Sequence, residues 1–386
     1  MNKSQEKVCA RCVMDTSAKE ITFDARGYCN FCEEFLSRFS HIQESTGGAR
    51  EVEFHEFVSK VKRQGFGKKY DCVVGVSGGV DSSWVLVKAI ELGLRPLAVH
   101  MDNGWNSELA QNNISNLVKG LNVDLVTHVI DWTEYRNMMQ AFFDSDVVDV
   151  ELLYDNAMLG VNYQQAAKFN IKYILGGTNL ATEGMKMPME WNHLKFDKRN
   201  IKAIVNRFGG YKLDTFPIIG VLQFVYYEFI AKRKWIHFLD KMDYDKEKAL
   251  TVLEAEYGYK RYPYKHYESI FTRFYQGYLL PKKFNIDKRK IHFSTLIASE
   301  QMSRDEALLD LEEDLAYPSQ RALDLDREYF LKKMKWDIKE LDDYLYRDSR
   351  PHSYYPSEEK LYKLLIKAYR GIGSLGTKLK SKIRAS

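Results

Sequence analysis

The sequence predicts an α/β protein built on a parallel β-sheet with helices on both faces. Four short apolar segments, at residues 72–76, 97–101, 124–130 and 173–175, are expected to be strands. The stretches between them have helical patterns, and strands that alternate with helices are typical of parallel sheets. Ligands of such sheets bind beyond the carboxyl ends of the strands, so the residues after these segments are the first candidates for a site.

Helices are expected wherever apolar residues recur every three or four positions. They span residues 51–63, 84–90, 107–121, 133–143 and 156–169. From about residue 223 the chain becomes rich in aromatic and charged residues, with helical patterns and no clear strand. We therefore expect a cysteine module at 1–50, a nucleotide-binding α/β domain at 51–222, and a mostly helical domain for substrate or partner binding at 223–386.

Length and composition argue against several classes of protein. The 386 residues allow two or three domains, and a net charge of only +4 does not indicate a nucleic-acid-binding protein. Residues 1–43 contain no apolar signal segment, and the sequence has no run of about 18 apolar residues for a transmembrane helix. We expect a cytoplasmic protein that neither binds nucleic acid nor spans a membrane.

Four of the five cysteines form two pairs, Cys9 with Cys12 and Cys29 with Cys32, separated by sixteen residues. In a cytoplasmic protein this spacing favours a metal site over disulfides. Four thiolates complete the tetrahedral shell of zinc and leave no position for water, so we expect a structural Zn²⁺ site. An iron–sulfur cluster and redox-active dithiols remain alternatives. Cys72 lies in an apolar strand and is expected to be buried and inert.

A glycine- and serine-rich loop follows the first predicted strand. It consists of Ser77, Gly78, Gly79, Val80, Asp81, Ser82 and Ser83. A strand, a glycine turn and a new helix form a phosphate cradle, because backbone amides and the helix end face the anion. The loop lacks the Gly-Lys-Ser/Thr ending of a Walker A motif. The alternative is an ordinary glycine turn before a helix.

This loop resembles the pyrophosphate loop (PP-loop) of the ATP pyrophosphatase superfamily, which cleaves ATP between its α and β phosphates. The hydroxyls of Ser77, Ser82 and Ser83 take the place of the missing lysine. Asp81 is expected to hold Mg²⁺ beside the departing pyrophosphate, or to cap the helix. We therefore predict Asp81, Ser77 and Ser82 as catalytic residues.

The ends of two other strands carry further candidates for ATP or Mg²⁺ contacts. Asp102 follows the second strand, where a simple turn aspartate is the alternative. Gly177 and Thr178 follow the last strand and are expected to approach the triphosphate. A helix N-cap is the alternative role of Thr178.

Residues with the chemistry to bind a substrate occur further along the chain. They are Glu183, Trp191, His266, Glu268, Ser269, Arg273 and Gln276. Residues 191–199 lack periodicity and are expected to form a loop over the site. Ser269, Arg273 and Gln276 are spaced to share one helix face and to bind a sugar or an acidic group. A solvated loop and a solvated helix face are the alternatives.

Several of these segments together resemble the N-acetyl sugar amidotransferase family of the PP-loop superfamily. The resemblance rests on residues 9–17, 21–24, 27–32, 77–83, 177–179, 182–184 and 268–274. It implies a PP-loop ATP pyrophosphatase fold with a zinc-binding cysteine module. It also implies a role in bacterial surface polysaccharide synthesis, such as lipopolysaccharide O-antigen, and in flagellin glycans.

The activity implied by this resemblance is that of an AMP-forming C–N ligase. ATP adenylates the acetamido oxygen of an activated, nucleotide-linked sugar, and ammonia then displaces AMP to give an acetamidino sugar. The chain begins with Met1 and Asn2 and has no thiol placed for a glutaminase. The resemblance therefore implies a separate glutaminase subunit and a cyclase-like ammonia-channel subunit, akin to those of imidazole glycerol phosphate synthase.

Two other functions fit the phosphate loop. A tRNA-thiolating enzyme of the same superfamily passes sulfur to an adenylated base, usually through cysteines beyond the loop. Here no cysteine follows Cys72, and no strongly basic face for tRNA is evident. A non-catalytic nucleotide-binding module is the second alternative.

Overall fold

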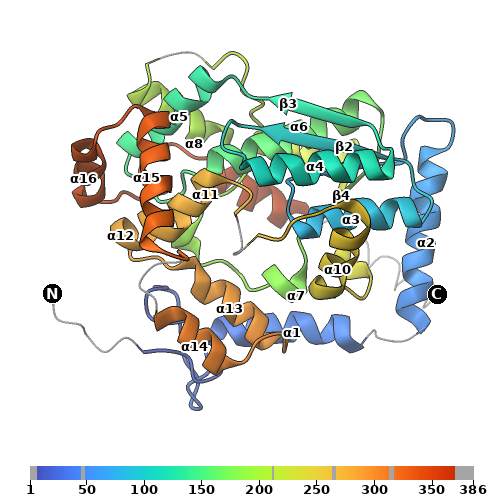
Figure 1. Ribbon diagram of the computed structural model, residues 1–386, viewed down its shortest axis with the longest axis horizontal. Coiled ribbons are helices and arrows are strands. Elements are labelled where there is room, and N and C mark those ends of the chain that lie inside the picture. Colours follow the sequence, from blue (N-terminus) through green and yellow to red (C-terminus); the bar gives the residue numbers. More distant parts are fainter. Residues whose placement is uncertain (1–6, 45–47, 211–212, 263–266, 313–316, 370–386) are drawn as a thin grey trace.

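A five-stranded parallel sheet forms the centre of the computed structural model (Figure 1), which describes residues 7–44, 48–210, 213–262, 267–312 and 317–369. The strands are β1 Cys72–Gly75, β2 Pro96–Asp102, β3 Leu125–Val129, β4 Tyr173–Gly176 and β5 Lys234–His237. Their order is β3-β2-β1-β4-β5, and all four pairs are parallel. The predicted α/β fold class is therefore confirmed.

Alternate residues of the central strands point to opposite faces of the sheet, and each face has its own apolar core. Val74 belongs to the core shared with α2 Gly48–Gly65, α3 Val80–Glu91, α4 Glu108–Leu121 and α10 Lys246–Tyr257. Val73 belongs to the core shared with α5 Trp132–Asp144 and α6 Leu152–Lys168. Both residues are fully buried, which explains why the first strand is apolar at every position.

The sheet extends beyond the expected boundary at residue 222, because β5 lies after it and pairs with β4 from Tyr173 to Gly176. The expectation that no strand follows residue 223 is therefore wrong. This strand has only four residues, lies at the sheet edge and is only partly buried. Its residues Lys-Trp-Ile-His thus lack the apolar run that marks a central strand.

Short helices and helical turns lie between β4 and β5 in the sequence and directly after β5. They are α7 Leu180–Glu183, the 3₁₀ turn Met189–Trp191, α8 Lys198–Phe208, α9 Val221–Val225, a π-helical turn Tyr226–Ile230 and a 3₁₀ turn Leu239–Lys241. Residues 197–199 were expected in a loop, but Asp197 is the N-cap of α8 and accepts from the amide of Asn200 at 2.9 Å. The capping aspartate fixes the start of this helix.

Most of the C-terminal helices share the apolar core of α5 and α6. The helices and turns of this region are α11 Ile270–Phe274, a π-helical turn Tyr275–Leu279, α12 Leu280–Phe284, α13 Lys288–Ala298, α14 Arg304–Glu312, α15 Gln320–Met334, α16 Ile338–Tyr346 and a 3₁₀ turn His352–Tyr354. Figure 1 shows α11, α12, α15 and α16 beside the sheet. The rings of Phe143, Phe330 and Trp336 pack edge to face with centroids 5.0 to 5.7 Å apart. Aromatic packing therefore joins these helices to α5.

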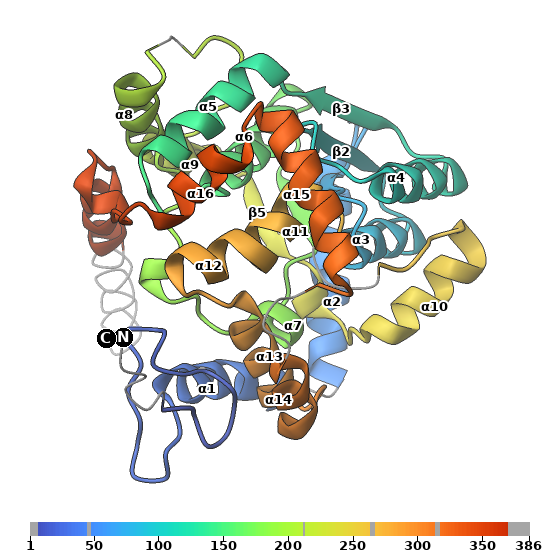
Figure 2. The same cartoon turned by 60° about the vertical axis from the view of Figure 1, so that its left-hand side comes forward.

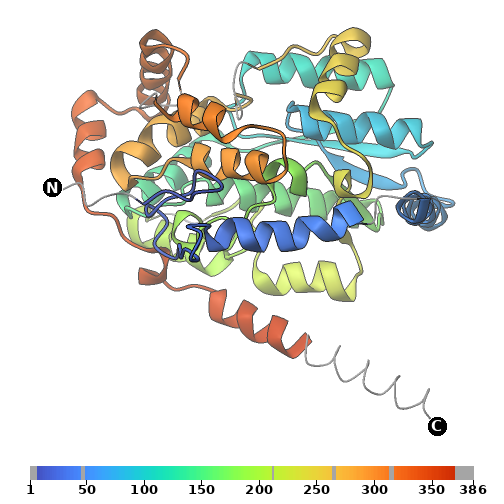
Figure 3. The ribbon, with the colours of Figure 1, turned by 90° about the horizontal axis from the view of Figure 1, so that it is seen from below.

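The cysteine module and helix α1 Asn30–Glu44 pack against α13 and α14 (Figure 2). Arg304 of α14 donates to the carbonyls of Cys9 and Cys12, both at 3.1 Å. Lys290 of α13 forms an ion pair with Asp15. The view from below shows α1 running alongside these helices (Figure 3). Within the parts of the chain that the structure describes, no helix is both long and apolar enough to cross a bilayer.

Replacing Gly160 of α6 by alanine is expected to destabilise the protein by about 1–3 kcal/mol. Alanine usually stabilises a helix relative to glycine, but a Cβ at this position would lie 2.1 Å from the carbonyl oxygen of Pro217. Urea unfolding followed by tryptophan fluorescence measures the change. Gln164→Ala, at an exposed position of the same helix, is the control and should have little effect. A Gly160→Ala variant as stable as the wild type would contradict this packing.

Candidate active site

The loop after β1 closes on itself through serine hydroxyls and backbone amides. The hydroxyl oxygens of Ser77 and Ser82 lie 3.2 Å apart, and the Ser77 amide donates to the Ser82 oxygen at 3.2 Å. The Gly79 amide donates to the Ser77 hydroxyl at 3.3 Å. Gly79 is also the N-cap of α3 and has no side chain to occupy the first amides of this helix. The loop thus combines hydroxyls with a helix N-terminus, an arrangement suited to an anion.

Three other loop residues shape the cradle rather than face it. Gly78 has a φ of 87°, and a Cβ there would lie 2.8 Å from the carbonyl oxygen of Ala110, so both conformation and space require glycine. Val80 is buried. Ser83 is also buried, and its hydroxyl donates to the Gly79 carbonyl at 2.8 Å. Of the three predicted hydroxyls, only those of Ser77 and Ser82 lie together.

The end of β4 reaches the same loop. A Cβ on Gly177 would lie 2.8 Å from the amide nitrogen of Ser82 and 3.1 Å from the Cβ of Asp81. Thr178 follows and is exposed. The N-cap of α7 is Asn179, which accepts from the amide of Thr182 at 2.9 Å, so the alternative of Thr178 as a helix cap is wrong.

Asp81 lies in the first turn of α3 and accepts a hydrogen bond from the Tyr244 hydroxyl. Burial and the negative charge of Asp81 raise the pKa of Tyr244 well above its usual range, and Glu183 adds to this shift. Tyr244 therefore remains a proton donor at neutral pH. Asp81 at the loop and Glu183 after β4 are carboxylates of the kind that Mg²⁺ prefers, and both contribute to the raised pKa of the half-buried Tyr244.

Asp102 holds the turn after β2. Its carboxylate accepts from the Gly104 amide at 2.9 Å and from the Asn106 side chain at 3.2 Å. Asn106 also lies 3.1 Å from Nε2 of His100, whose Nδ1 is 2.9 Å from the Val76 carbonyl. These hydrogen bonds give Asp102 the role of a turn aspartate that ties together the ends of β1 and β2. A contact with ATP remains a prediction.

Glu268 lies directly against the phosphate loop. Its carbonyl accepts from the Ser107 amide at 2.8 Å, and the Ile270 amide donates to the Trp105 carbonyl at 2.9 Å. A Cβ on Gly79 would lie 2.5 Å from the Glu268 carboxylate oxygen. Backbone pairing with the turn after β2 therefore carries this acid to the loop, as expected for a site residue.

The other predicted substrate residues have structural partners. Ser269 is the N-cap of α11, and Arg273 forms an ion pair with Asp326. Gln276 donates to Glu151 at 2.8 Å. The expectation of one α-helical face is wrong, because the chain changes from α-helix to a π-helical turn after residue 274.

Trp191 does not join the site. Trp191 was expected in a loop over the substrate, but its side chain is buried in the apolar core with 1% exposure. Its size and apolar ring surface account for this position. His266 lies outside the described residues.

A buried ionic network lies at the start of α6. Lys195 bridges the carboxylates of Asp149 and Asp155, each at 2.8 Å. Burial opposes the charge on Lys195, but the two carboxylates outweigh this effect and raise its pKa. Burial alone would raise the pKa of Asp149, yet Lys195 and its neighbours lower it to about 2.

Asp155 is the accessible member of this network. Burial raises its pKa, although 32% of its side chain remains exposed. Asp155 is thus partly desolvated but remains reachable by solvent. The neighbouring Tyr154 has a raised pKa because of burial and of the carboxylates Asp155, Glu268 and Glu151. Tyr154 therefore experiences the charges of both the network and the acid beside the phosphate loop.

A cavity of about 290 Å³ opens at the ends of β4 and β5. It is lined by Arg38, Thr178, Asn179, Leu180, Glu183, Gly184, His237 and Asp240. Its volume is close to the lower end of the range of ~300–1,000 Å³ for ligand pockets. The cavity includes two of the predicted residues, Thr178 and Glu183.

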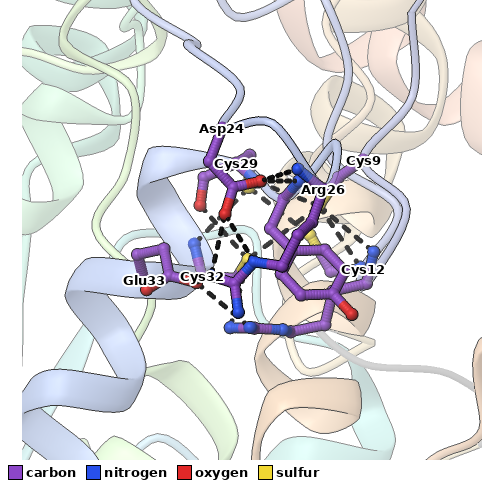
Figure 4. Close-up of polar contacts among 9 residues, drawn as sticks. Cys9, Cys12, Asp24, Arg26, Cys29, Cys32 and Glu33 are labelled. Atoms are coloured by element: carbon purple, nitrogen blue, oxygen red, sulfur yellow. Dashed lines mark hydrogen bonds and ion pairs between the residues drawn. The ribbon is translucent and has the colours of Figure 1, made fainter.

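The four paired cysteines converge at a candidate metal centre, as predicted (Figure 4). Their sulfurs lie within 4.8 Å of one another, all four residues are fully buried, and none forms a disulfide. The sulfurs of Cys12 and Cys29 are 3.6 Å apart, and those of Cys9 and Cys32 are 3.9 Å apart. Tetrahedral Zn–S bonds of about 2.3 Å require sulfur separations of about 3.8 Å, so the four thiols fit zinc.

Backbone amides support this sulfur cluster. The amides of Cys29 and Arg11 donate to the Cys9 sulfur at 3.2 and 3.4 Å, and the amide of Cys32 donates to the Cys29 sulfur at 3.4 Å. Such bonds stabilise thiolates, the form that binds a metal.

The C-terminal part of the chain matches a known family. Residues 268–369 match the family described as "LPS biosynthesis protein WbpG-like, C-terminal domain", where LPS is lipopolysaccharide. The match begins at Glu268, the residue that contacts the phosphate loop. It agrees with the resemblance to sugar amidotransferases of LPS biosynthesis.

A curated protein is similar to part of this chain. An uncharacterized protein of Methanocaldococcus jannaschii is 30% identical over 128 residues, which are 33% of this chain and 44% of that protein. The chain thus spans less than half the length of this curated relative.

Two solved structures are also similar. The NMN synthetase of Francisella tularensis has 16% identity and a TM-score of 0.28, covering 56% of this chain and 98% of its own. The ammonia-dependent NAD synthetase of Campylobacter jejuni has 17% identity and a TM-score of 0.28, covering 54% and 83%.

The structure adds residues that the sequence patterns did not indicate. Tyr244 and Arg38 reach the site from segments distant in sequence, and Lys195 joins two acids of α6 and its preceding turn. An isolated tyrosine, arginine or lysine carries no local motif. Only the acids Asp149, Glu151 and Asp155, closely spaced around the start of α6, gave a signal that could have been followed.

Purified protein is expected to contain about one zinc per chain, bound by the four cysteines. Cys9→Ser should lose most of the metal and lower the melting temperature, because the metal supplies folding energy to a segment with little core of its own. Elemental analysis and thermal unfolding measure both effects.

The control for this experiment is Cys72→Ala, which removes the fifth cysteine without touching the cluster and should retain the metal. Iron in place of zinc, or full metal content in Cys9→Ser, would contradict the assignment.

Proposed function

We propose that this chain is an ATP-dependent, AMP-forming amidotransferase of bacterial surface polysaccharide biosynthesis. It converts an acetamido group of an activated, nucleotide-linked sugar to an acetamidino group. The observation that carries the proposal is the position of Glu268. The WbpG-like domain of LPS biosynthesis begins at this residue, and the residue lies against Gly79 of the phosphate loop.

The first step of the proposed reaction is attack of the acetamido oxygen on the α-phosphorus of ATP. The P–O bond to the β-phosphate breaks, and pyrophosphate leaves. The amides at the start of α3 and the hydroxyls of Ser77 and Ser82 bind the pyrophosphate and stabilise its developing charge. Asp81 and Glu183 are the residues that would hold Mg²⁺, which neutralises phosphate charge when bound.

The second step is attack of ammonia on the amide carbon of the adenylated sugar. The C–O bond breaks, AMP leaves with the former acetamido oxygen, and a proton is released. Adenylation is needed because an amide oxygen is a poor leaving group. We propose Asp155 as the group that accepts a proton from ammonium, because it is partly exposed and burial raises its pKa.

We propose that the acceptor sugar binds beside Glu268 at the phosphate loop and reaches the partly exposed pair of Asp155 and Lys195. Carboxylate and ammonium groups at partly exposed positions suit the hydroxyls of a sugar. This places the acetamido group beside Glu268. Asp102 and Thr178 remain candidates for ATP contacts at the adjacent strand ends.

We further propose that ammonia comes from a glutaminase subunit through a cyclase-like channel subunit, and that the complex works in the cytoplasm. The four cysteines hold a structural Zn²⁺ rather than a catalytic metal, because four thiolates leave no coordination position for a substrate.

Incubation with ATP, Mg²⁺, ammonium and diacetamido nucleotide sugars should release pyrophosphate and yield a sugar in which NH replaces one oxygen, detected by mass spectrometry. Asp81→Asn should reduce pyrophosphate release at least about 100-fold, the loss typical of removing one charge-stabilising group. Asp342→Asn, an exposed aspartate of α16, is the matched control and should keep full activity.

No sugar-dependent pyrophosphate release from wild-type protein with any diacetamido nucleotide sugar would overturn the proposed function. Full activity of Asp81→Asn would overturn only the role of this residue. Equal activity with glutamine and no partner would remove the need for a glutaminase.

A further inference from the structure

The phosphate loop has no positively charged side chain to neutralise a bound pyrophosphate. Residues 77–83 contain no lysine or arginine, and Asp81 and nearby Glu268 add negative charge. Departing pyrophosphate carries several negative charges, which amides, hydroxyls and one divalent ion neutralise only in part. A cationic side chain from another element is therefore needed near the loop.

Arg38 of α1 occupies a position suited to this need. It lines the cavity of about 290 Å³ that begins at Thr178, the residue after Gly177. Gly177 in turn packs against the amide of Ser82 in the phosphate loop. Arg38 is the only lysine or arginine among the described residues that line this cavity. Glu183 also lines this cavity. Its negative charge, like that of Asp81, raises the pKa of Tyr244.

The guanidinium of Arg38 is held in place but retains donors for a ligand. Its Nη2 donates to the Gly184 carbonyl at 3.0 Å, and its Nη1 lies 3.9 Å from the exposed carboxylate of Glu34. A guanidinium has five N–H donors, so these contacts leave several for an anion. The side chain is 44% exposed, which makes it accessible from the cavity.

The cysteine module fixes this arginine through the helix that carries it. Cys32 lies within α1, and Arg38 follows six residues later, about 9 Å along the helix axis. The module is anchored to α13 and α14 by the Lys290–Asp15 ion pair and by the bonds from Arg304. The position of Arg38 therefore depends on a cluster that lies outside the nucleotide-binding sheet.

We propose that Arg38 binds the pyrophosphate end of ATP, so that the cysteine module supplies the cation that the phosphate loop lacks. This inference rests on the proposed cleavage of ATP at the α-phosphorus. It predicts that Arg38 contacts the leaving group and not AMP. Arginine suits this role because its planar fork of donors matches phosphate oxygens.

Isothermal titration calorimetry with Mg²⁺-pyrophosphate and, separately, with AMP tests the inference directly. Arg38→Ala should weaken pyrophosphate binding about 10- to 100-fold, the loss expected for a charge-assisted hydrogen bond, and leave AMP binding unchanged. Arg38→Lys should recover part of the affinity. Arg26→Ala, an exposed arginine of the same module, is the matched control and should bind both ligands as the wild type does.

Arg38→Gln keeps an N–H donor for the Gly184 carbonyl but removes the charge, so it serves if the alanine variant does not fold. It should show the same selective loss. Unchanged pyrophosphate binding in a folded variant, or equal weakening of AMP and pyrophosphate, would overturn the assignment. Wild-type protein that binds neither ligand contradicts the proposed function itself, whereas wild-type binding with an unaffected Arg38 variant contradicts only this inference.

Discussion

The rest of the site depends on the close packing of neighbouring segments against the backbone of the phosphate loop. Three glycines allow it: Gly78 against Ala110 of α4, Gly79 against Glu268, and Gly177 against Ser82. At each, an added Cβ would come within 2.8 Å of another atom. Helix α4, the end of β4 and the segment that begins at Glu268 therefore meet at one loop.

Parts of the chain far from the sheet in sequence also reach this loop. The cysteine module contributes α1, whose Arg38 lines the cavity beside Thr178. The C-terminal region contributes Glu268 through backbone pairing with the turn after β2. An enzyme that joins ATP to a sugar amide has to bring two substrates to one phosphorus. The positions of Arg38 and Glu268 show how segments distant in the sequence can contribute side chains to one site.

Sequence patterns predicted the features that depend on local order and missed those that depend on tertiary contacts. The four cysteines and the loop at 77–83 were found because spacing and glycines define them within a few residues. The strand β5 was missed because an edge strand needs no apolar run, and Tyr244 was missed because a single tyrosine has no motif. The spacing of Ser269, Arg273 and Gln276 predicts a binding face, but these residues form a helix cap, an ion pair and a partly buried hydrogen bond.

The central claim is that the acetamido oxygen of the sugar attacks the α-phosphorus of ATP. Labelling this oxygen with a heavy isotope and analysing the products by mass spectrometry tests the claim most directly. The account predicts that the label appears in AMP, that pyrophosphate stays unlabelled, and that the acetamidino product loses the label. Label in a released phosphate or in pyrophosphate, or label retained in the product, would contradict it.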